Sequence, residues 1–166
     1  TNIFLAAALN TKNKVIYIDT EGSFSVERFK QLGGKYKDMK RIRFFEPHTW
    51  KEQHNSVMKL EEIIKKERIE LIIIDSLVAL YRLALDPTKQ DIVTLINKQL
   101  SSEYCTLSRL ARQNKIAVLV TNHIYNIGDQ VELTSKSIAR YWSKCLIELK
   151  KQEKPNHRTA IIRKHR

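Results

Sequence analysis

The sequence predicts an α/β fold, with a mostly parallel sheet covered by helices on both faces and a C-terminal antiparallel hairpin. Three apolar runs, at 14–21, 71–76 and 117–123, are rich in β-branched residues and end in polar side chains. Such runs are typical of strands buried in a parallel sheet. Amphipathic stretches separate them, and alternating strands and helices favour a sheet of this kind. Because ligands bind at the carboxyl ends of such strands, we expect the polar side chains to form a site.

Length and charge restrict the possible functions. The 166 residues fit one domain, and a chain of about 150 residues buries roughly 70% of its unfolded surface. Thirty Lys and Arg against eighteen Asp and Glu give a net charge of +12. This excess favours a polyanionic partner, most commonly nucleic acid, although a solvated basic surface is the alternative. The basic residues recur at 35–43, 59–68, 136–144 and 150–166, so folding has to assemble any patch.

Other features argue against a membrane or secreted protein. No apolar run approaches the ~20 residues of a membrane span. Residues 3–9 lack the basic leader and cleavage site of a secretory signal. The two cysteines, Cys105 and Cys145, lie far apart without metal-type spacing. We expect them to be small buried side chains of an intracellular protein rather than a disulfide. The expected location is therefore the cytoplasm.

The first half of the chain is expected to alternate helix and strand. The expected elements are the end of a helix over 1–11, a strand over 14–21, a helix over 25–32, a strand over 41–46 and a helix over 49–68. Ser25 and Thr49 are good N-caps for the second and third helices. Gly33 and Gly34 are a C-terminal helix signal, and Pro47 stops the strand before it. The first helix starts without a cap, so the chain is expected to begin inside an element.

The second half continues the alternation. The expected elements are a strand over 71–76, a connection over 77–90, a long helix over 89–113, a strand over 117–123, a loop over 124–136, a helical turn over 138–143, and strands over 145–150 and 159–164. The long helix is predicted to turn its apolar residues inward: Ile92, Leu95, Ile96, Leu107 and Leu110. The last two strands flank a polar turn at 155–156, which indicates an antiparallel hairpin.

Two carboxylates at the strand ends are the candidate metal-binding and catalytic residues. Asp75 follows four apolar residues, and a carboxylate at that edge can hold Mg²⁺ opposite phosphates. The alternative is that many parallel strands simply end in Asp. Glu21 directly follows the first strand, where it could orient or deprotonate the water that attacks a terminal phosphate. The alternative for Glu21 is a cap of the helix that begins near Ser25. Asp19 is expected to be structural.

The third strand delivers the polar sequence Thr121-Asn122-His123. Asn122 and His123 would lie beside the phosphates, where the imidazole could sense a γ-phosphate. The alternative is a histidine that satisfies a loop carbonyl. Tyr125 could stack on a base, although a tyrosine after a strand more often packs at the edge of the core.

Four segments together resemble the RecA/RadA recombinase family. Residues 17–29, which begin Tyr-Ile-Asp-Thr-Glu-Gly, are similar to the segment after the family's P-loop helix. Residues 71–82 look like its Walker B strand, 120–122 match the strand before its second DNA loop, and 164–166 match the end of its last shared strands. The resemblance covers nearly the whole chain, and the short loops look most like the archaeal RadB branch.

The resemblance implies a RecA-like P-loop NTPase fold and a single ATPase core domain over 1–166. It implies that ATP and Mg²⁺ are cofactors, that Glu21 activates water, that Asp75 is linked to the metal, and that Asn122 and His123 contact nucleotide. The family's P-loop sequence is absent. Thr1 is expected to be its last residue, a ligand of nucleotide and of Mg²⁺, so the chain is expected to be truncated at its N-terminus. His123 also replaces the family's usual glutamine, and the glycines expected near 134–136 are absent.

The resemblance further implies single-stranded DNA as a partner, with association to a partner recombinase or to itself, in the nucleoid of the cytoplasm. The candidate DNA contacts are Arg82 and Lys89 beside the first loop and Lys136 and Arg140 beside the second. Contacts from Lys and Arg to the backbone give salt-dependent affinity that tolerates many sequences. Two functions are open: a DNA-dependent ATPase of recombination and repair, or an accessory protein with little or no hydrolysis. An unrelated doubly wound enzyme acting on an acidic metabolite is a third reading.

Overall fold

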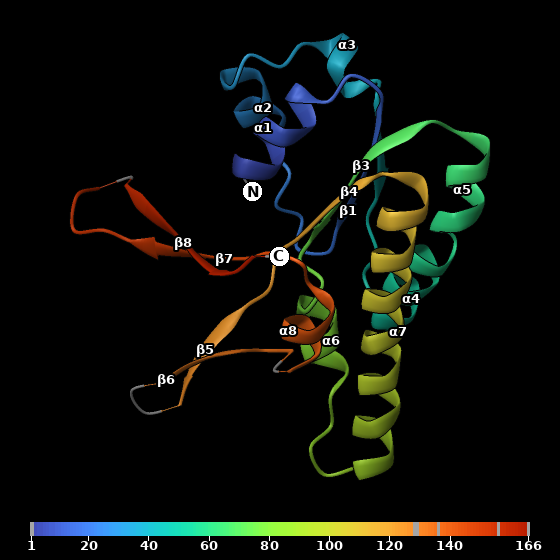
Figure 1. Cartoon of the computed structure of the whole chain (residues 1–166), viewed down its shortest axis with the longest axis vertical. Helices are drawn as coiled ribbons and strands as arrows, with labels where there is room; N and C mark the ends of the chain where they lie inside the picture. The colour runs from blue at the N-terminus through green and yellow to red at the C-terminus, as the bar shows by residue number, and fades with distance from the viewer. Residues whose placement is uncertain (1, 128–129, 136, 156, 166) are drawn as a thin grey trace.

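A computed structural model describes residues 2–127, 130–135, 137–155 and 157–165. Its centre is a four-stranded parallel sheet in the order β2-β1-β3-β4 (Figure 1). The strands are β1 (Lys14–Asp19), β2 (Ile42–Phe45), β3 (Ile69–Asp75) and β4 (Ala117–Val120). β1 and β3 bury nearly every side chain. This confirms the predicted parallel sheet, whose strands read as continuous apolar runs because both faces are covered.

Helices cover both faces of the sheet. The helices are α1 (Asn2–Asn10), α2 (Val26–Gln31), α3 (Tyr36–Met39), α4 (Trp50–Met58), α5 (Leu60–Lys66), α6 (Ala79–Ala84), α7 (Gln90–Asn114) and α8 (Ser137–Trp142). On one face, Phe4 and Phe29 of α1 and α2 pack with Tyr17 and Ile73. On the other face, the alternate strand residues pack with α4, α5, α6, α7 and α8. The period of two along each strand therefore divides the core into two clusters.

Local sequence signals set several helix ends as predicted. The Ser25 hydroxyl accepts a hydrogen bond from the backbone N–H of Arg28, and the Thr49 hydroxyl accepts one from Glu52. Gly33 follows α2 with a φ of 93°, a conformation that favours glycine. The helix predicted over 49–68 is interrupted at Lys59 and forms two shorter helices, α4 and α5.

Two hairpins lie outside the sheet and project away from the helices (Figure 1). β7 (Leu146–Lys151) and β8 (Arg158–Lys164) form the predicted C-terminal antiparallel hairpin. The loop predicted over 124–136 is wrong for most of its described residues, which form β5 (Ile124–Ile127) and β6 (Gln130–Leu133). The helical turn predicted near 138–143 is confirmed as α8.

Two predictions of burial are wrong. Ile92 and Leu95 are exposed, because the N-terminal end of α7 extends past the sheet (Figure 1). Cys105 and Cys145 are exposed free thiols rather than buried side chains. Cys105 lies beside, not on, the stripe of α7 that contains Leu100, Tyr104 and Leu107. Within the described part of the chain, no helix is long and apolar enough to cross a membrane.

Candidate functional site

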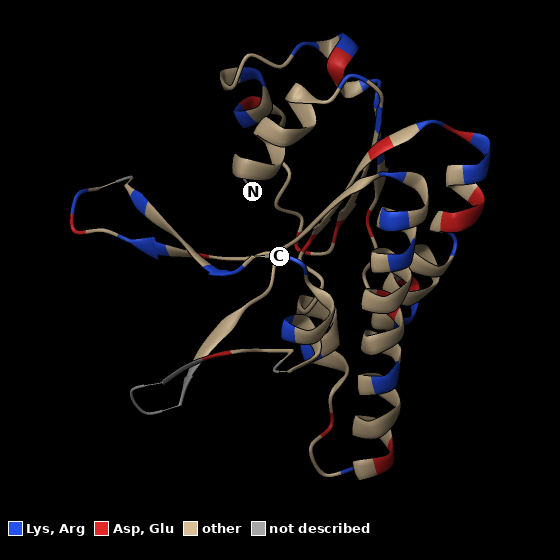
Figure 2. Cartoon of the chain, viewed as in Figure 1, with Lys and Arg blue, Asp and Glu red and all other residues tan. Residues whose placement is uncertain are grey.

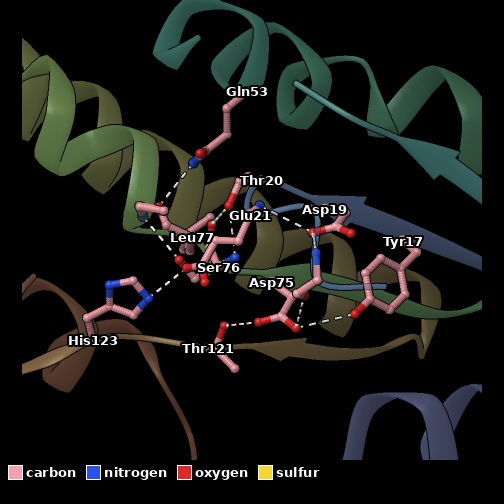
Figure 3. Close-up of polar contacts among 12 residues, drawn as sticks. Tyr17, Asp19, Thr20, Glu21, Gln53, Asp75, Ser76, Leu77, Thr121 and His123 are labelled. Atoms are coloured by element: carbon pink, nitrogen blue, oxygen red, sulfur yellow. Dashed lines mark hydrogen bonds and ion pairs between the residues drawn. The ribbon is translucent and has the colours of Figure 1, made fainter. Parts of the chain in front are cut away.

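The carboxyl ends of β1, β3 and β4 meet at one edge of the sheet (Figure 3). Asp19 is paired in register with Asp75, and Ile74 with Val120. Backbone hydrogen bonds continue past the strands, since Thr20 N–H donates to the Asp75 carbonyl at 3.0 Å and Leu77 N–H to the Thr121 carbonyl at 3.2 Å. The polar side chains predicted for this edge are therefore brought together on a fixed backbone.

Asp75 is held by three hydroxyl groups. Thr121 donates to Oδ1 at 2.7 Å, and Ser23 and Tyr17 donate to Oδ2 at 3.0 and 3.3 Å. The residue is only 5% exposed. Burial, followed by the nearby Asp75 and Asp19 carboxylates, raises the pKa of Tyr17, so its phenol stays a donor. The carboxylate therefore has a fixed orientation. The roles of Ser23, Thr121 and Tyr17 were not predicted from the sequence.

Asp19 organises the turn that carries Glu21. Its carboxylate accepts the backbone N–H groups of Glu21, Ser23 and Phe24 at 3.2, 3.1 and 2.9 Å. Gly22 supplies the positive φ of 62° that the turn requires. The structural role predicted for Asp19 agrees with these contacts.

Thr20 joins this turn to the residue after Asp75. Its hydroxyl donates to the Ser76 carbonyl at 2.8 Å and accepts from the Ser76 N–H at 2.9 Å. The Asp75–Ser76 peptide is cis. One hydroxyl thus serves both backbone groups of a single residue, which ties the turn after β1 to the end of β3.

Glu21 and His123 face each other across the edge (Figure 3). Glu21 Oε1 lies 2.7 Å from His123 Nε2, and both side chains are about one-third exposed, at 35% and 34%. Ser25, not Glu21, caps α2. The imidazole thus contacts a carboxylate rather than the loop carbonyl considered as its alternative. The predicted water-activating residue and the predicted phosphate sensor form one exposed pair.

Asn122 is turned toward α7 and α8. Its side-chain N–H groups donate to the Tyr104 hydroxyl at 3.2 Å and to the Ser135 hydroxyl. Its Oδ1 atom is buried and has no hydrogen-bond partner among the described residues. Ser135 is buried and lies between β6 and α8. Asn122 therefore connects the end of β4 to the segment that enters α8, and its predicted nucleotide contact stays a prediction.

A buried polar network lies behind the edge. Gln53 of α4 donates to the Leu77 carbonyl at 3.0 Å (Figure 3). It also donates to Glu103 Oε2 at 2.9 Å. His54 Nδ1 lies 3.1 Å from Glu103 Oε1. Burial raises the pKa of Glu103, and the hydrogen bonds from His54 and Gln53 oppose that rise. The network fixes the backbone two residues after Asp75 and was not predicted, because nothing local in the sequence reveals a pairing of α4 with α7.

The predicted DNA contacts lie on separate elements. Arg82 is exposed on α6, Lys89 precedes α7 and pairs with Asp86 at 3.1 Å, and Arg140 of α8 pairs with Glu132 at 3.2 Å. Thr1 and Lys136 lie outside the described residues. Figure 2 shows that basic residues also continue along β7 and β8.

The chemistry of the edge fits Mg²⁺ bound together with phosphates. Across the described ranges, no group of three or more His, Cys, Asp or Glu side chains could hold a metal ion by itself. Mg²⁺ typically keeps several waters and uses one or two carboxylates with substrate phosphates. Asp75, with the hydroxyls of Ser23 and Thr121 beside it, offers oxygen atoms of that kind.

Comparisons with known proteins agree with this architecture. A family model described as Rad51 matches residues 5–140. A DNA repair and recombination protein RadB of Methanococcus maripaludis is 39% identical over 172 residues, which span all of this chain and 77% of that protein. A RadB of Methanobrevibacter smithii is 35% identical over 178 residues and is covered to 74% of its length. A crystal structure of the RadB recombinase superposes with a TM-score of 0.79 at 25% identity, over 99% of this chain and 75% of that one.

Proposed function

Because the chain belongs to the Rad51 family and matches RadB proteins along its whole length, we propose that it is an ATP- and DNA-binding protein of homologous recombination and DNA repair. The RecA-like fold expected from the sequence is confirmed by the likeness to the RadB recombinase. We further propose that residues 1–166 form one ATPase core domain that acts in the nucleoid of the cytoplasm.

This proposal rests on one observation: the carboxyl ends of β1, β3 and β4 bring their polar side chains together at one edge of the sheet. Asp75, fixed by hydroxyl groups, would hold Mg²⁺ on ATP, and Glu21 would orient the attacking water. When bound, Mg-ATP supplies the phosphoryl group and the charge that organises the edge. Asn122 and His123 would contact the nucleotide from β4. Thr1, predicted as a further ligand of nucleotide and of Mg²⁺, belongs to the same proposal.

Single-stranded DNA is the proposed partner. Arg82, Lys89 and Arg140 would contact its phosphates, with Lys136 as a fourth candidate. The net charge of +12 supports a polyanionic partner. Contacts of this kind neutralise phosphates and release counterions, so the affinity falls as the salt concentration rises.

A second candidate function is supported by the contact between Glu21 and His123. A glutamate that is 2.7 Å from an imidazole has to leave that partner, or share it, before it can orient water. This contact favours an accessory protein that binds nucleotide and DNA, hydrolyses ATP slowly, and associates with a partner recombinase or with itself.

The test combines Glu21→Gln with a matched control, Glu27→Gln, in the neighbouring helix α2. ATP hydrolysis and fluorescence anisotropy of labelled single-stranded DNA are measured with and without Mg-ATP. Glu21→Gln is expected to lower hydrolysis by about 10²-fold or more, because general-base catalysis typically contributes that much. It should leave the response of DNA binding to Mg-ATP intact, and Glu27→Gln should change neither measurement.

The outcomes separate the candidates. If the wild type hydrolyses ATP at a measurable rate and Glu21→Gln does so at the same rate, Glu21 is not the catalytic base. If neither protein hydrolyses ATP measurably while Mg-ATP still changes DNA binding, the chain is the accessory protein. DNA binding that ignores both strand type and Mg-ATP would contradict the proposed function.

A further inference from the structure

An aromatic hollow of about 360 Å³ lies between α7 and α8. Its lining residues are Ser101 of α7 and Ser137, Ile138, Tyr141 and Trp142 of α8. Tyr141 is 74% exposed. Its ring packs edge-to-face on Trp142 with 5.1 Å between ring centroids. Tyr141 thus presents an aromatic ring to solvent at a hollow that two serines also line.

The hollow lies in a strongly basic part of the chain. Residues 137–165 contain eight Lys and Arg against two Glu, so they carry half of the net charge of +12. Arg140 precedes Tyr141 on α8, and Lys164 donates to the Arg140 carbonyl at 2.5 Å, which brings a cation of β8 to the same helix. Figure 2 shows basic residues on α8 and along both strands of the β7–β8 hairpin. Charge complementarity therefore points to a polyanionic occupant.

We propose that this hollow binds an unpaired base of single-stranded DNA, with Tyr141 as the stacking platform. This inference rests on the proposed function, in which single-stranded DNA is the partner. That proposal includes only Lys and Arg contacts to the phosphates and no contact to a base. Every base has a π-face, so an aromatic side chain next to cations binds single strands of any sequence. The Ser101 and Ser137 hydroxyls can form hydrogen bonds with base edges.

The surroundings of the hollow favour a base over an apolar protein segment. Interface cores that hold apolar anchors are typically depleted of charged residues. Here the lining residues are uncharged, but Arg140 lies on the helix that forms the hollow, and Lys164 contacts the backbone of Arg140. A duplex cannot use the site, because its bases are stacked and paired.

The test measures fluorescence anisotropy of two labelled oligonucleotides of equal length, oligo(dT) and an abasic strand with the same backbone. Tyr141→Ala is expected to weaken binding of oligo(dT) about tenfold, since stacking on one aromatic residue typically contributes that much. Binding of the abasic strand should not change, and Tyr141→Phe should behave like wild type. The matched control is Tyr36→Ala, because Tyr36 is also 74% exposed but lies on α3, at the top of Figure 1 and away from α8.

Several outcomes would overturn the inference. If Tyr141→Ala weakens both strands equally, or weakens neither, Tyr141 is not a stacking residue. If it leaves DNA binding intact but reduces the mass of a self-associated species in light scattering, the hollow binds protein instead. Circular dichroism of each variant verifies folding, with Tyr141→Ser as a second variant. A wild type that does not bind single strands would contradict the proposed function together with the stacking site, whereas a loss confined to the Tyr141 comparison contradicts the stacking site alone.

Discussion

The central sheet and the C-terminal hairpin use similar apolar residues in opposite ways. In β3, every residue from Leu71 to Asp75 is buried between two layers of helices. In the β7–β8 hairpin, Ile147 and Ile162 are paired in register and both are exposed, as is Leu149 on the same strand as Ile147. The sheet therefore forms the centre of the hydrophobic core and fixes the positions of the carboxylates at its edge. The hairpin is stabilised by its own ladder and leaves its surface open for contacts, as is common for binding elements.

The largest expected effect tests this division by stability. Leu100 of α7 is 0% exposed and Leu149 of β7 is 49% exposed. Leu100→Ala should lower the free energy of unfolding by about 3 kcal/mol, because it removes buried methyl groups and leaves a cavity. Leu149→Ala should change it by about 0.5 kcal/mol or less. Urea unfolding measures both, and equal losses would show that the hairpin belongs to the cooperative core.

A smaller effect tests the division by function. Arg140 lies on α8 outside the sheet and pairs with Glu132, whereas Arg109 of α7 pairs with Glu61 of α5 at 2.8 Å. Arg140→Gln should weaken single-stranded DNA binding and reduce the slope of log affinity against log salt by about one. Arg109→Gln is the matched control and should leave the slope unchanged. Anisotropy across a salt series measures the slope, and an equal change in both variants would show that the charge acts without a defined contact.

The smallest effect has opposite signs in the two regions. Burial raises the pKa of Glu103, whereas the hydrogen bond from Arg163, at 2.6 Å, lowers the pKa of Glu148 on β7. The stabilising contribution of protonated Glu103 to the free energy of unfolding is fully present below its usual pKa of 4.5. It is lost as pH rises through the raised pKa. The contribution of Glu148 is present above 4.5 and is lost as pH falls through the lowered value.

Thermal unfolding across pH therefore distinguishes the two carboxylates. Relative to wild type, Glu103→Gln should gain melting temperature as pH rises from about 4.5 to about 7. Glu148→Gln should lose a little as pH rises above the lowered pKa of Glu148, since its exposed pair with Arg163 contributes weakly. The same sign for both variants would contradict the assignment of Glu103 as a buried carboxylate in the folded state.

Local signals were sufficient for much of the fold. The β-branched runs predicted β1, β3 and β4, and the hydroxyls of Ser25 and Thr49 marked two helix starts correctly. The sequence pattern also brought Glu21, Asp75 and His123 to one edge, because parallel strands end on the same side.

The missed features depend on contacts between distant segments. Tyr17 donates to Asp75 only because the register pairs β1 with β3, and no periodicity within one strand reveals that contact. Ile92 and Leu95 fit an inward helical stripe, but α7 is longer than the sheet that it covers, so its first turns have nothing to pack on. The β5–β6 hairpin was missed because its two strands have only four residues each.

The two tryptophans of the chain give each region its own optical reporter. Trp50 is buried under the sheet, where its indole N–H donates to Gln99 at 2.6 Å, and Trp142 lies half-buried at the hollow beside Tyr141. In a Trp50→Phe background, tryptophan emission comes from α8 alone, and the proposed stacking site predicts that it is quenched when a single strand binds. In a Trp142→Phe background, tryptophan emission comes from Trp50 alone and is expected to follow the packing of α4 against α7. The two single-tryptophan proteins would therefore report ligand binding and core unfolding separately, without an added label.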